Sequence, residues 1–175
     1  PETGEYRGSL AGQGYAHGSA WTRGQAWALY GFARCYEHTG RPEFLDTAKR
    51  VATYCLAHVD ETKALPIDFD QPKDALLIDN SATAVYASGV LSLARAVEGE
   101  DAALAARLNQ QALALLHVLD QQYVDYTTQR DNLVNGASSR YYEDHHGYPI
   151  IYADFYYIEA LLKVCERELA RAVWA

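Results

Sequence analysis

The chain has 175 residues, 49% of them hydrophobic, and its 23 acidic and 15 basic residues leave a formal net charge of −8. This length suits one domain with a sizeable core. The acidic balance and the lack of a long basic run exclude nucleic acid as an expected partner. No stretch reaches the roughly 18 apolar residues that would predict a membrane-spanning helix.

The cysteines and histidines predict neither a disulfide framework nor a metal site. The three cysteines, Cys35, Cys55 and Cys165, are odd in number, widely spaced and set in helical apolar patterns. A free thiol in such a pattern behaves as a small hydrophobe. The six histidines lack the spacing of metal ligands, so we expect no metal ion.

Helical periodicity dominates the chain and predicts five helices. In chain order they run from Ser19 as N-cap to about His38, from Pro42 through an amphipathic stretch, from about Ser81 to Val97, from about Ala102 to Tyr123, and from Ile150 to about Ala172. Gly40 is expected to end the first helix, and Pro42 to occupy the first turn of the second. Residues 60–79 are expected to form a long irregular loop, organised by Asp68 and Asp70.

The helices alternate in character between two layers. The first, third and fifth helices are mostly apolar, whereas the second and fourth are amphipathic, with one apolar and one polar face. A weak internal repeat supports this alternation, because Gly31 recurs as Gly89 and Gly40 as Gly99, 58 and 59 residues apart. Stacked hairpins of an inner and an outer helix predict an all-α fold, either a closed α/α toroid or an open solenoid. Because the fifth helix has no outer partner, we expect the set to be incomplete.

The segment around Arg23 carries the most informative chemistry. On a helix, Arg23 and Trp27 share one face, and Gly24 beside them allows close approach. An indole stacks on a sugar ring, and a guanidinium matches a carboxylate through two parallel hydrogen bonds, so the pair would suit a uronic acid. Spacing alone favours the structural alternative, a buried cation–π pair that holds the helix against its neighbour.

Four ordered motifs resemble those of the unsaturated glucuronyl hydrolases. They are Gln13-Gly14-Tyr15 with the run from Trp21 to Phe32, then Asp68-Phe69-Asp70, Asp79-Asn80-Ser81-Ala82, and the run from Ile151 to Leu161. The resemblance covers nearly the whole chain. It implies that residues 1–175 are the C-terminal portion of one (α/α)6 toroid, a six-hairpin catalytic domain whose N-terminal half lies outside this chain.

The resemblance implies a bacterial hydrolase of polysaccharide degradation. Its substrates are oligosaccharides released by polysaccharide lyases. Its reaction is hydration of the C4=C5 double bond of the terminal unsaturated glucuronyl residue, which needs no metal or cofactor. The essential aspartates of the family lie upstream, so no catalytic residue is expected in this chain, which should be inactive alone. The expected partners are the small unsaturated substrate and the N-terminal half of the same domain, with no membrane.

This chain is expected to supply substrate-binding residues. Gln13, Arg23 and Trp27 align with family residues that contact the unsaturated uronate. Further candidates for the pocket or its supporting layer are Trp21, Gln25, Tyr15, Asp79 and Asp154. From the residues alone, Asp79 is expected to cap the third helix, while Asp154 could bond neighbouring helices or line the cavity.

The residues ahead of the last helix bear on whether the sugar is sulfated. Members of the family that accept sulfated sugars carry a Ser/Ser/Lys pattern ahead of the last helix. Ser139, Tyr142 and Asp144 occupy about those places here, so a preference for sulfated substrates is not expected.

Three alternatives stay open at this point. Related unsaturated rhamnogalacturonyl hydrolases usually show Arg-Gly-Asn where this chain has Arg23-Gly24-Gln25, and other α/α-toroid carbohydrate enzymes share the architecture. A non-catalytic α-solenoid scaffold would need shorter and more evenly spaced repeats. The compartment also stays open between the cytoplasm, which is favoured, and the periplasm.

Overall fold

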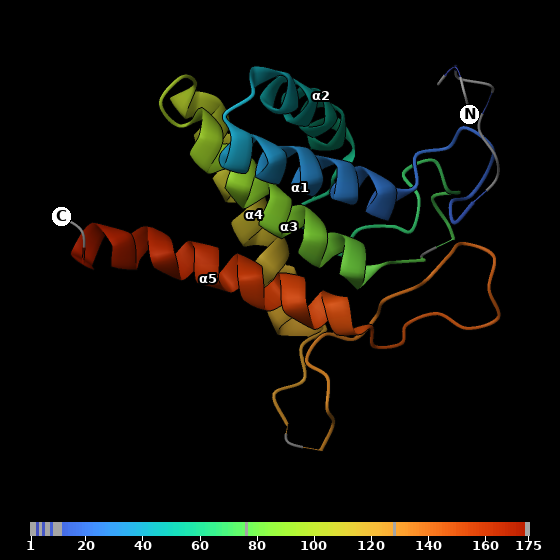
Figure 1. Cartoon of the computed structure of the whole chain (residues 1–175). Coiled ribbons are helices and arrows are strands. Elements are labelled where there is room, and N and C mark those ends of the chain that lie inside the picture. Colours follow the sequence, from blue (N-terminus) through green and yellow to red (C-terminus); the bar gives the residue numbers. More distant parts are fainter. Residues whose placement is uncertain are drawn as a thin grey trace.

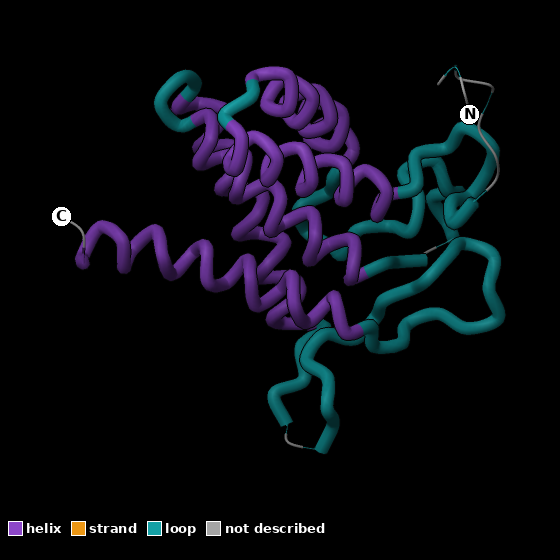
Figure 2. The backbone as a smooth tube through the Cα atoms, in the orientation of Figure 1, coloured by secondary structure: helices purple, strands orange, loops and turns teal. Residues whose placement is uncertain are grey.

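The computed structural model describes residues 3, 5, 8, 12–75, 77–127 and 129–173, with side chains as far as Glu166. Its helices are α1 (Thr22–Thr39), α2 (Pro42–His58), α3 (Asn80–Val97), α4 (Ala102–Gln122) and α5 (Ile151–Val173) (Figure 1). Figure 2 shows helices joined by loops, with no strand in the described parts of the chain. Isolated antiparallel bridges link some of the loops. The predicted all-α class and the five helices are confirmed.

The predicted helix bounds hold to within a few residues, except at the start of α1. The prediction of Ser19 as N-cap is wrong, because α1 begins later and Trp21 holds the N-cap position without a side-chain bond. The backbone of residues 20–22 instead bonds to that of residues 67–69, with two N–H···O distances of 3.0 Å. This pairing keeps the approach to α1 extended, and the Ser19 hydroxyl donates to Asp68 at 2.7 Å.

The other helix ends follow their local signals. Gly40 ends α1 in the left-handed region, at φ 66°, and its N–H donates to the Tyr36 carbonyl at 2.7 Å. Pro42 is the first residue of α2, where its missing N–H costs nothing. Asp79 and Asp101 cap α3 and α4 by accepting backbone N–H groups.

Helix α3 lies at the centre of the molecule. It packs against α1 on one side and α5 on the other, while α2 covers α1 and α4 covers α3 (Figure 1). Residues 80–91 are buried without interruption, and Arg95 in the last turn is exposed. The N-terminal ends of α1, α3 and α5 face the side where the long loops gather (Figure 1). The first, third and fifth helices therefore form the inner layer.

The two repeated helix glycines have different surroundings. A Cβ atom added to Gly89 would lie 3.0 Å from both the Cα and the backbone nitrogen of Tyr30, so α1 and α3 cross in direct backbone contact there. A Cβ atom added to Gly31 would meet nothing within 4 Å. Only the glycine in α3 is needed for the packing of the described helices.

A half-buried polar cluster links α5 to α1 and α3. The Glu159 carboxylate accepts from the Tyr30 hydroxyl at 3.0 Å and from the Ser88 hydroxyl. Lys163 donates to Glu159 at 3.2 Å and to the Ser92 hydroxyl at 2.9 Å. Burial raises the pKa of Glu159, but the Ser88 hydrogen bond and the Lys163 charge outweigh burial, so this pKa is lowered. The cluster therefore stabilises the fold with Glu159 ionised.

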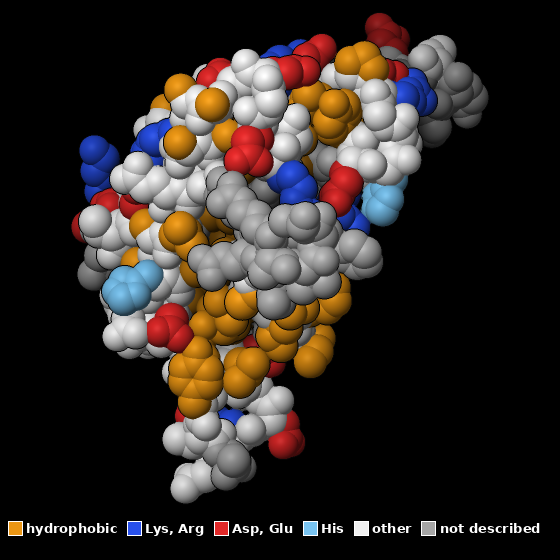
Figure 3. Space-filling model, turned by 90° about the vertical axis from the view of Figure 1, so that its left-hand side faces the viewer, with side chains coloured by type: hydrophobic (Ala, Val, Ile, Leu, Met, Phe, Trp, Pro, Cys, Tyr) orange, Lys and Arg blue, Asp and Glu red, His pale blue; other side chains and the backbone are white. Residues whose placement is uncertain are grey.

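The outer side of α5 carries an exposed apolar stripe. Ile151, Phe155, Ile158 and Leu162 are 79%, 56%, 43% and 54% exposed, and their spacing places them on one helix face. Figure 3 views the molecule from the end where α5 finishes and shows hydrophobic side chains gathered beneath that end. Among the described residues, α5 thus lacks the outer helix that α1 and α3 have.

Substitution of the two glycines should give opposite results. Gly89→Ala places a methyl group against the Tyr30 backbone and should destabilise the protein by about 1–3 kcal/mol. Gly31→Ala, the matched control in a helix interior, should stabilise it by about 0.5–1 kcal/mol. Urea unfolding of both variants measures the difference. A neutral Gly89→Ala would show that α1 and α3 are not in backbone contact.

Glu159→Gln tests the polar cluster. Because the folded-state pKa of Glu159 is lowered, its contribution is present above the unfolded value of about 4.3 and is lost as the pH falls through the folded-state pKa. We expect a loss of about 2 kcal/mol at pH 7, typical of hydrogen bonds to charged groups. Urea unfolding should show this loss shrinking below about pH 4.

The control for Glu159→Gln is Glu100→Gln, which breaks the exposed ion pair with Lys49. This change should cost no more than about 1 kcal/mol at pH 7. If the two variants lose the same stability, the half-buried cluster of Glu159 contributes no more than a surface ion pair.

Candidate functional site

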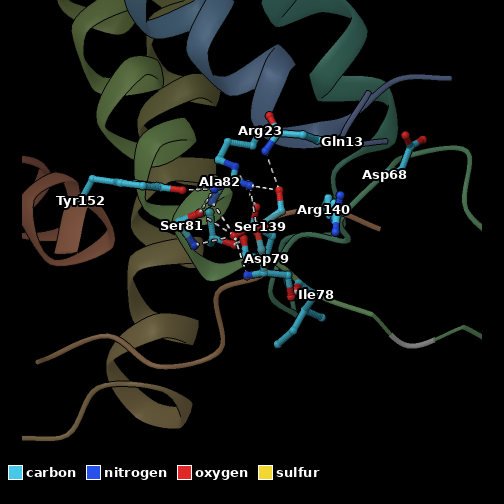
Figure 4. Close-up of polar contacts among 12 residues, drawn as sticks. Gln13, Arg23, Asp68, Ile78, Asp79, Ser81, Ala82, Ser139, Arg140 and Tyr152 are labelled. Atoms are coloured by element: carbon cyan, nitrogen blue, oxygen red, sulfur yellow. Dashed lines mark hydrogen bonds and ion pairs between the residues drawn. The ribbon is translucent and has the colours of Figure 1, made fainter. Parts of the chain in front are cut away.

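The N-terminal ends of the three inner helices meet at one buried guanidinium. Arg23, from the first turn of α1, is 2% exposed. It points toward Asp79 and Ser81 at the start of α3 and toward Tyr152 at the start of α5 (Figure 4). Ser139, from the loop before α5, closes the group. Side chains far apart in the sequence are thus gathered where the loops cover the helix ends.

Each N–H group of Arg23 faces a protein partner. Nε lies 3.2 Å from the Asp79 carboxylate, Nη1 donates to the Ser81 hydroxyl at 3.3 Å and to the Tyr152 hydroxyl, and Nη2 donates to the carbonyls of Ser138 at 2.9 Å and Ser139 at 2.5 Å. The two terminal nitrogens therefore donate four hydrogen bonds, whereas Nε makes none and faces Asp79 as an ion pair. The Arg23 partners divide by exposure: Asp79, Ser81 and Ser138 are buried, whereas Tyr152 and Ser139 are half-buried.

Asp79 both caps α3 and faces Arg23. One carboxylate oxygen accepts from the Ser81 N–H at 3.0 Å and from the Ser81 hydroxyl at 2.5 Å. The other lies opposite Arg23, and Asp79 is fully buried. Burial raises the pKa of Asp79, while the Arg23 charge opposes the rise. The predicted cap is confirmed, and the ion pair with Arg23 is a second role that periodicity could not show.

Gln13 and Arg23 both donate hydrogen bonds to the backbone carbonyl of Ser139. The side-chain amide of Gln13 donates to the Ser139 carbonyl at 2.7 Å, and the backbone carbonyl of Gln13 accepts from the Tyr141 N–H at 2.8 Å. Gln13 is exposed, in contrast to Arg23. Tyr15, two residues on, packs edge-to-face on Tyr141, with ring centroids 5.0 Å apart. The segment before α1 and the loop before α5 therefore form one surface.

Trp27 lies in a cluster of aromatic side chains with Tyr152 and Tyr156, next to Arg23. Its ring centroid lies 5.9 Å from that of Tyr152 and 5.1 Å from that of Tyr156. The rings that lie near the guanidinium of Arg23 are those of Trp21, at 5.1 Å, and Tyr152, at 5.6 Å. The cation–π alternative considered for Trp27 is therefore realised by Trp21 and Tyr152 instead.

The remaining candidates support loops and helix ends. Trp21 packs on Gly24, where an added Cβ would lie 2.8 Å from the indole. Gln25 is half-buried and donates its backbone N–H to the Trp21 carbonyl at 3.1 Å. Both oxygens of Asp154 accept loop N–H groups, from Leu133 at 3.1 Å and Val134 at 2.7 Å. In this arrangement Asp154 anchors the loop before α5.

Asp68 organises the long loop, as expected from the sequence. It is fully buried, and its carboxylate accepts the backbone N–H groups of Tyr15 and Asp70, both at 2.9 Å, and the Ser19 hydroxyl at 2.7 Å. Figure 4 shows it away from the contacts of Arg23.

Sequence reasoning missed two partners of Arg23. Tyr152 lies inside the motif that opens α5, but three tyrosines occur there and periodicity does not single out one. The Ser138–Ser139 turn reaches Arg23 only through its backbone carbonyls, which leave no signal in side-chain type. The Glu143 carboxylate stabilises this turn. It accepts from the Ser139 N–H and hydroxyl, both at 2.9 Å, and from the Tyr148 hydroxyl at 3.0 Å.

The described residues contain no cluster of three or more side chains that could hold a metal ion. None of the helices, over the part of the chain that the structure describes, is long and apolar enough to cross a membrane.

Comparison with known proteins gives consistent relatives, although no family model matches the chain. An unsaturated glucuronyl hydrolase from Bacillus sp. (strain GL1) is 33% identical over 170 residues, which are 94% of this chain and 44% of the relative. A structure of an unsaturated glucuronyl hydrolase specific for heparin matches with a TM-score of 0.83 and 29% identity, covering 95% of this chain and 45% of that one.

A third match includes a bound sugar. A point mutant of an unsaturated glucuronyl hydrolase from Streptococcus agalactiae, complexed with dGlcA-GalNAc6S, matches with a TM-score of 0.76 and 26% identity, over 94% of this chain and 44% of that one. This chain therefore spans less than half the length of the relatives it matches. Its five helices match part of an (α/α)6 barrel, which removes the open solenoid as a description of the fold.

Asp79→Ala tests the ion pair at the centre of this site. The change removes the cap of α3 and leaves the buried charge of Arg23 without its partner, so we expect a loss of about 3–5 kcal/mol. Asp101→Ala is the matched control, because Asp101 caps α4 at an exposed end. It should cost about 1 kcal/mol. Similar losses in urea unfolding would mean that the ion pair adds nothing beyond capping.

Proposed function

Because the chain is homologous to the unsaturated glucuronyl hydrolases, we propose that it is part of a hydrolase acting on unsaturated uronic-acid oligosaccharides released by polysaccharide lyases. Homology over 94% of the chain carries this proposal. The meeting of Gln13, Arg23 and Trp27 around Ser139 and Tyr152 supports it. Residues 1–175 would form the C-terminal portion of one catalytic domain.

The proposed reaction is a hydration. A carboxylic acid protonates C4 of the unsaturated uronate, and water adds at C5 with assistance from a carboxylate acting as general base. The resulting hemiketal opens, and the glycosidic bond is lost. The two aspartates needed for these proton transfers would come from the N-terminal half of the domain. We propose no metal and no cofactor.

Arg23 would bind the uronate carboxylate by exchanging partners. Its buried side stays on Asp79, Ser81 and Ser138. The half-buried hydroxyl of Tyr152 and carbonyl of Ser139 lie on its open side. A carboxylate that displaces these two would take one N–H from each terminal nitrogen, which is the fork geometry that suits it. Fixing the carboxylate this way orients C5 toward the water and the proton donor.

Trp27 and Gln13 would complete the binding surface. Trp27 is half-buried beside Tyr152, so one part of its indole is free to stack on a sugar ring. The exposed amide of Gln13 needs little rearrangement to reach a sugar hydroxyl, because its present partner is the same Ser139 carbonyl that the substrate would free.

We propose that the sugar is unsulfated. The Ser139 hydroxyl, at the position of the sulfate-accepting pattern, donates to the Glu143 carboxylate at 2.9 Å. Burial raises the pKa of Glu143, but hydrogen bonds from Ser139 and Tyr148 outweigh it and lower the pKa, so the group is anionic at neutral pH. A negative charge there repels a sulfate ester.

The rest of the domain would cover the apolar stripe of α5. Ile151, Phe155, Ile158 and Leu162 form a surface of the kind that is buried in a complete layered fold. The N-terminal half of the same domain is the proposed occupant, since the relatives are more than twice as long as the matched part.

The function is tested by ultraviolet absorbance of the C4=C5 bond. The 175-residue chain alone should not consume an unsaturated glucuronyl disaccharide, whereas the complete domain should. In the complete domain, Arg23→Ala should lower kcat/KM by about 10- to 150-fold, the equivalent of a charged hydrogen bond. Arg23→Lys should recover part of this loss, because a point charge lacks the planar fork.

Arg34→Ala on the same helix breaks the ion pair with Glu37, away from the contacts of Arg23. It is the matched control and should leave kcat/KM unchanged. Thermal unfolding of each variant separates binding from stability. The proposed binding role of Arg23 fails if Arg23→Ala keeps its kcat/KM and only melts at a lower temperature. Turnover by the chain alone would overturn the placement of the proton-transferring groups outside it.

A further inference from the structure

The two peptide groups of the Ser138–Ser139 turn lie between a cation and an anion. Their carbonyls, on Ser138 and Ser139, accept from Nη2 of Arg23 at 2.9 and 2.5 Å. Their N–H groups, on Ser139 and Arg140, donate to one oxygen of the Glu143 carboxylate at 2.9 and 3.4 Å. Because the C=O and N–H bonds of a trans peptide point in opposite directions, Arg23 and Glu143 lie on opposite sides of the turn.

The two charges favour the same orientation of both peptide groups. A hydrogen bond with a charged partner is roughly twice as strong as one between neutral groups, and each bond in a chain of hydrogen bonds polarises the next. Here the chain has the guanidinium of Arg23 at one end and the carboxylate of Glu143 at the other. The charge of Glu143 therefore strengthens the hydrogen bonds that the turn accepts from Arg23.

The Glu143 carboxylate is itself held in place. Its second oxygen accepts from the hydroxyls of Ser139 at 2.9 Å and Tyr148 at 3.0 Å, and Nδ1 of His146 lies 3.3 Å from the first oxygen. The Glu143 side chain is only 13% exposed. Burial raises the pKa of Glu143, but the hydrogen bonds from Ser139 and Tyr148 outweigh burial and lower it. A fixed negative charge thus faces the N–H side of the turn at neutral pH.

We propose that Glu143 is a positioning residue of the Arg23 site, acting through the two peptide groups of the Ser138–Ser139 turn. It keeps the Ser139 carbonyl on Arg23 until a carboxylate displaces that carbonyl. The arrival of a uronate carboxylate rests on the proposed function, whereas the coupling of Glu143 to Arg23 rests on the hydrogen bonds of the turn.

This coupling affects which ligands can reach Arg23. A group that displaces the Ser139 carbonyl has to replace a hydrogen bond that Glu143 has strengthened. A carboxylate does so, because its full negative charge meets the guanidinium in a forked pair. A neutral sugar hydroxyl forms a weaker bond to Arg23 and leaves the displaced carbonyl uncompensated. Glu143 therefore makes the site selective for an anion, at some cost in affinity for that anion.

NMR of the ¹⁵N-labelled chain tests the coupling without any ligand. Glu143→Gln keeps the size of the side chain and its ability to bond to Ser139 and Tyr148, but removes the charge. We expect the Nη2 protons of Arg23 to move upfield and to exchange faster with water, because their bonds to the turn weaken. The Nε proton, which faces Asp79 instead, should stay in place. Tyr148→Phe removes one donor to Glu143 but keeps its charge, and should move the Nη2 protons less, in the same direction.

Asp74→Asn is the matched control, because it removes a negative charge from an exposed position near the same loop. Burial raises the pKa of the neighbouring Tyr141, and the Asp74 charge adds to this rise, so Asp74 acts on the loop without bonding to the turn. The Arg23 signals should not move in this variant. The inference is overturned if Glu143→Gln leaves the Nη2 protons in place, if Asp74→Asn moves them as far, or if the Nε proton moves equally.

Kinetics of the complete domain test the consequence for substrate. Glu143→Gln should lower the KM for an unsaturated glucuronyl disaccharide about two- to fivefold, the size of a modest charge interaction, and leave kcat unchanged. A raised KM would overturn the inference, because the turn would then assist binding rather than oppose it. An unchanged KM together with the Nη2 shift would support the coupling and count against the exchange of partners in the proposed function.

Discussion

The contact between Arg23 and Asp79 joins the starts of α1 and α3 inside the protein, with both side chains almost wholly removed from water. Burying two charges is costly, and their attraction offsets the cost only when hydrogen bonds satisfy the remaining atoms. Here Ser81 bonds to both residues, and the carbonyls of Ser138 and Ser139 take the free end of the guanidinium. The loop before α5 is therefore placed by the same charge that holds the helices.

The inner helices are held in two distinct ways along their length. At the loop end, polar contacts to Arg23 set the positions of residues that would face substrate. Deeper in the layer, Gly89 lets α1 and α3 touch, and Glu159 with Lys163 fastens α5 to both. A rigid layer of this kind can present a binding surface from its loops without moving as a whole. The proposed binding residues thus lie at the loop end of the inner helices, and the contacts that hold the helices together lie further along them.

The division of labour in the proposed enzyme follows from which groups are present. This chain offers a guanidinium, an indole and an amide around one turn, which suit recognition of a uronate. Its buried carboxylates are already occupied: Asp79 by Arg23 and the α3 cap, Asp154 by loop N–H groups, and Asp68 by the segment before α1. In the proposed enzyme, proton transfer would therefore come from groups outside the chain, and the rest of the domain would pack on the exposed apolar stripe of α5.

The sequence by itself was sufficient for the helices, their two layers and the cap by Asp79, because periodicity, glycine, proline and capping signals act over a few residues. The homology to the unsaturated glucuronyl hydrolases was visible in four ordered motifs. It misplaced the start of α1, because residues 20–22 pair with residues 67–69 of a distant loop, and no local signal reports such pairing. Only the folded arrangement revealed that Arg23 lies against Asp79 and donates to the half-buried Tyr152 and Ser139. Those contacts depend on backbone carbonyls and on chain segments 116 and 129 residues away, and neither leaves a trace in residue spacing.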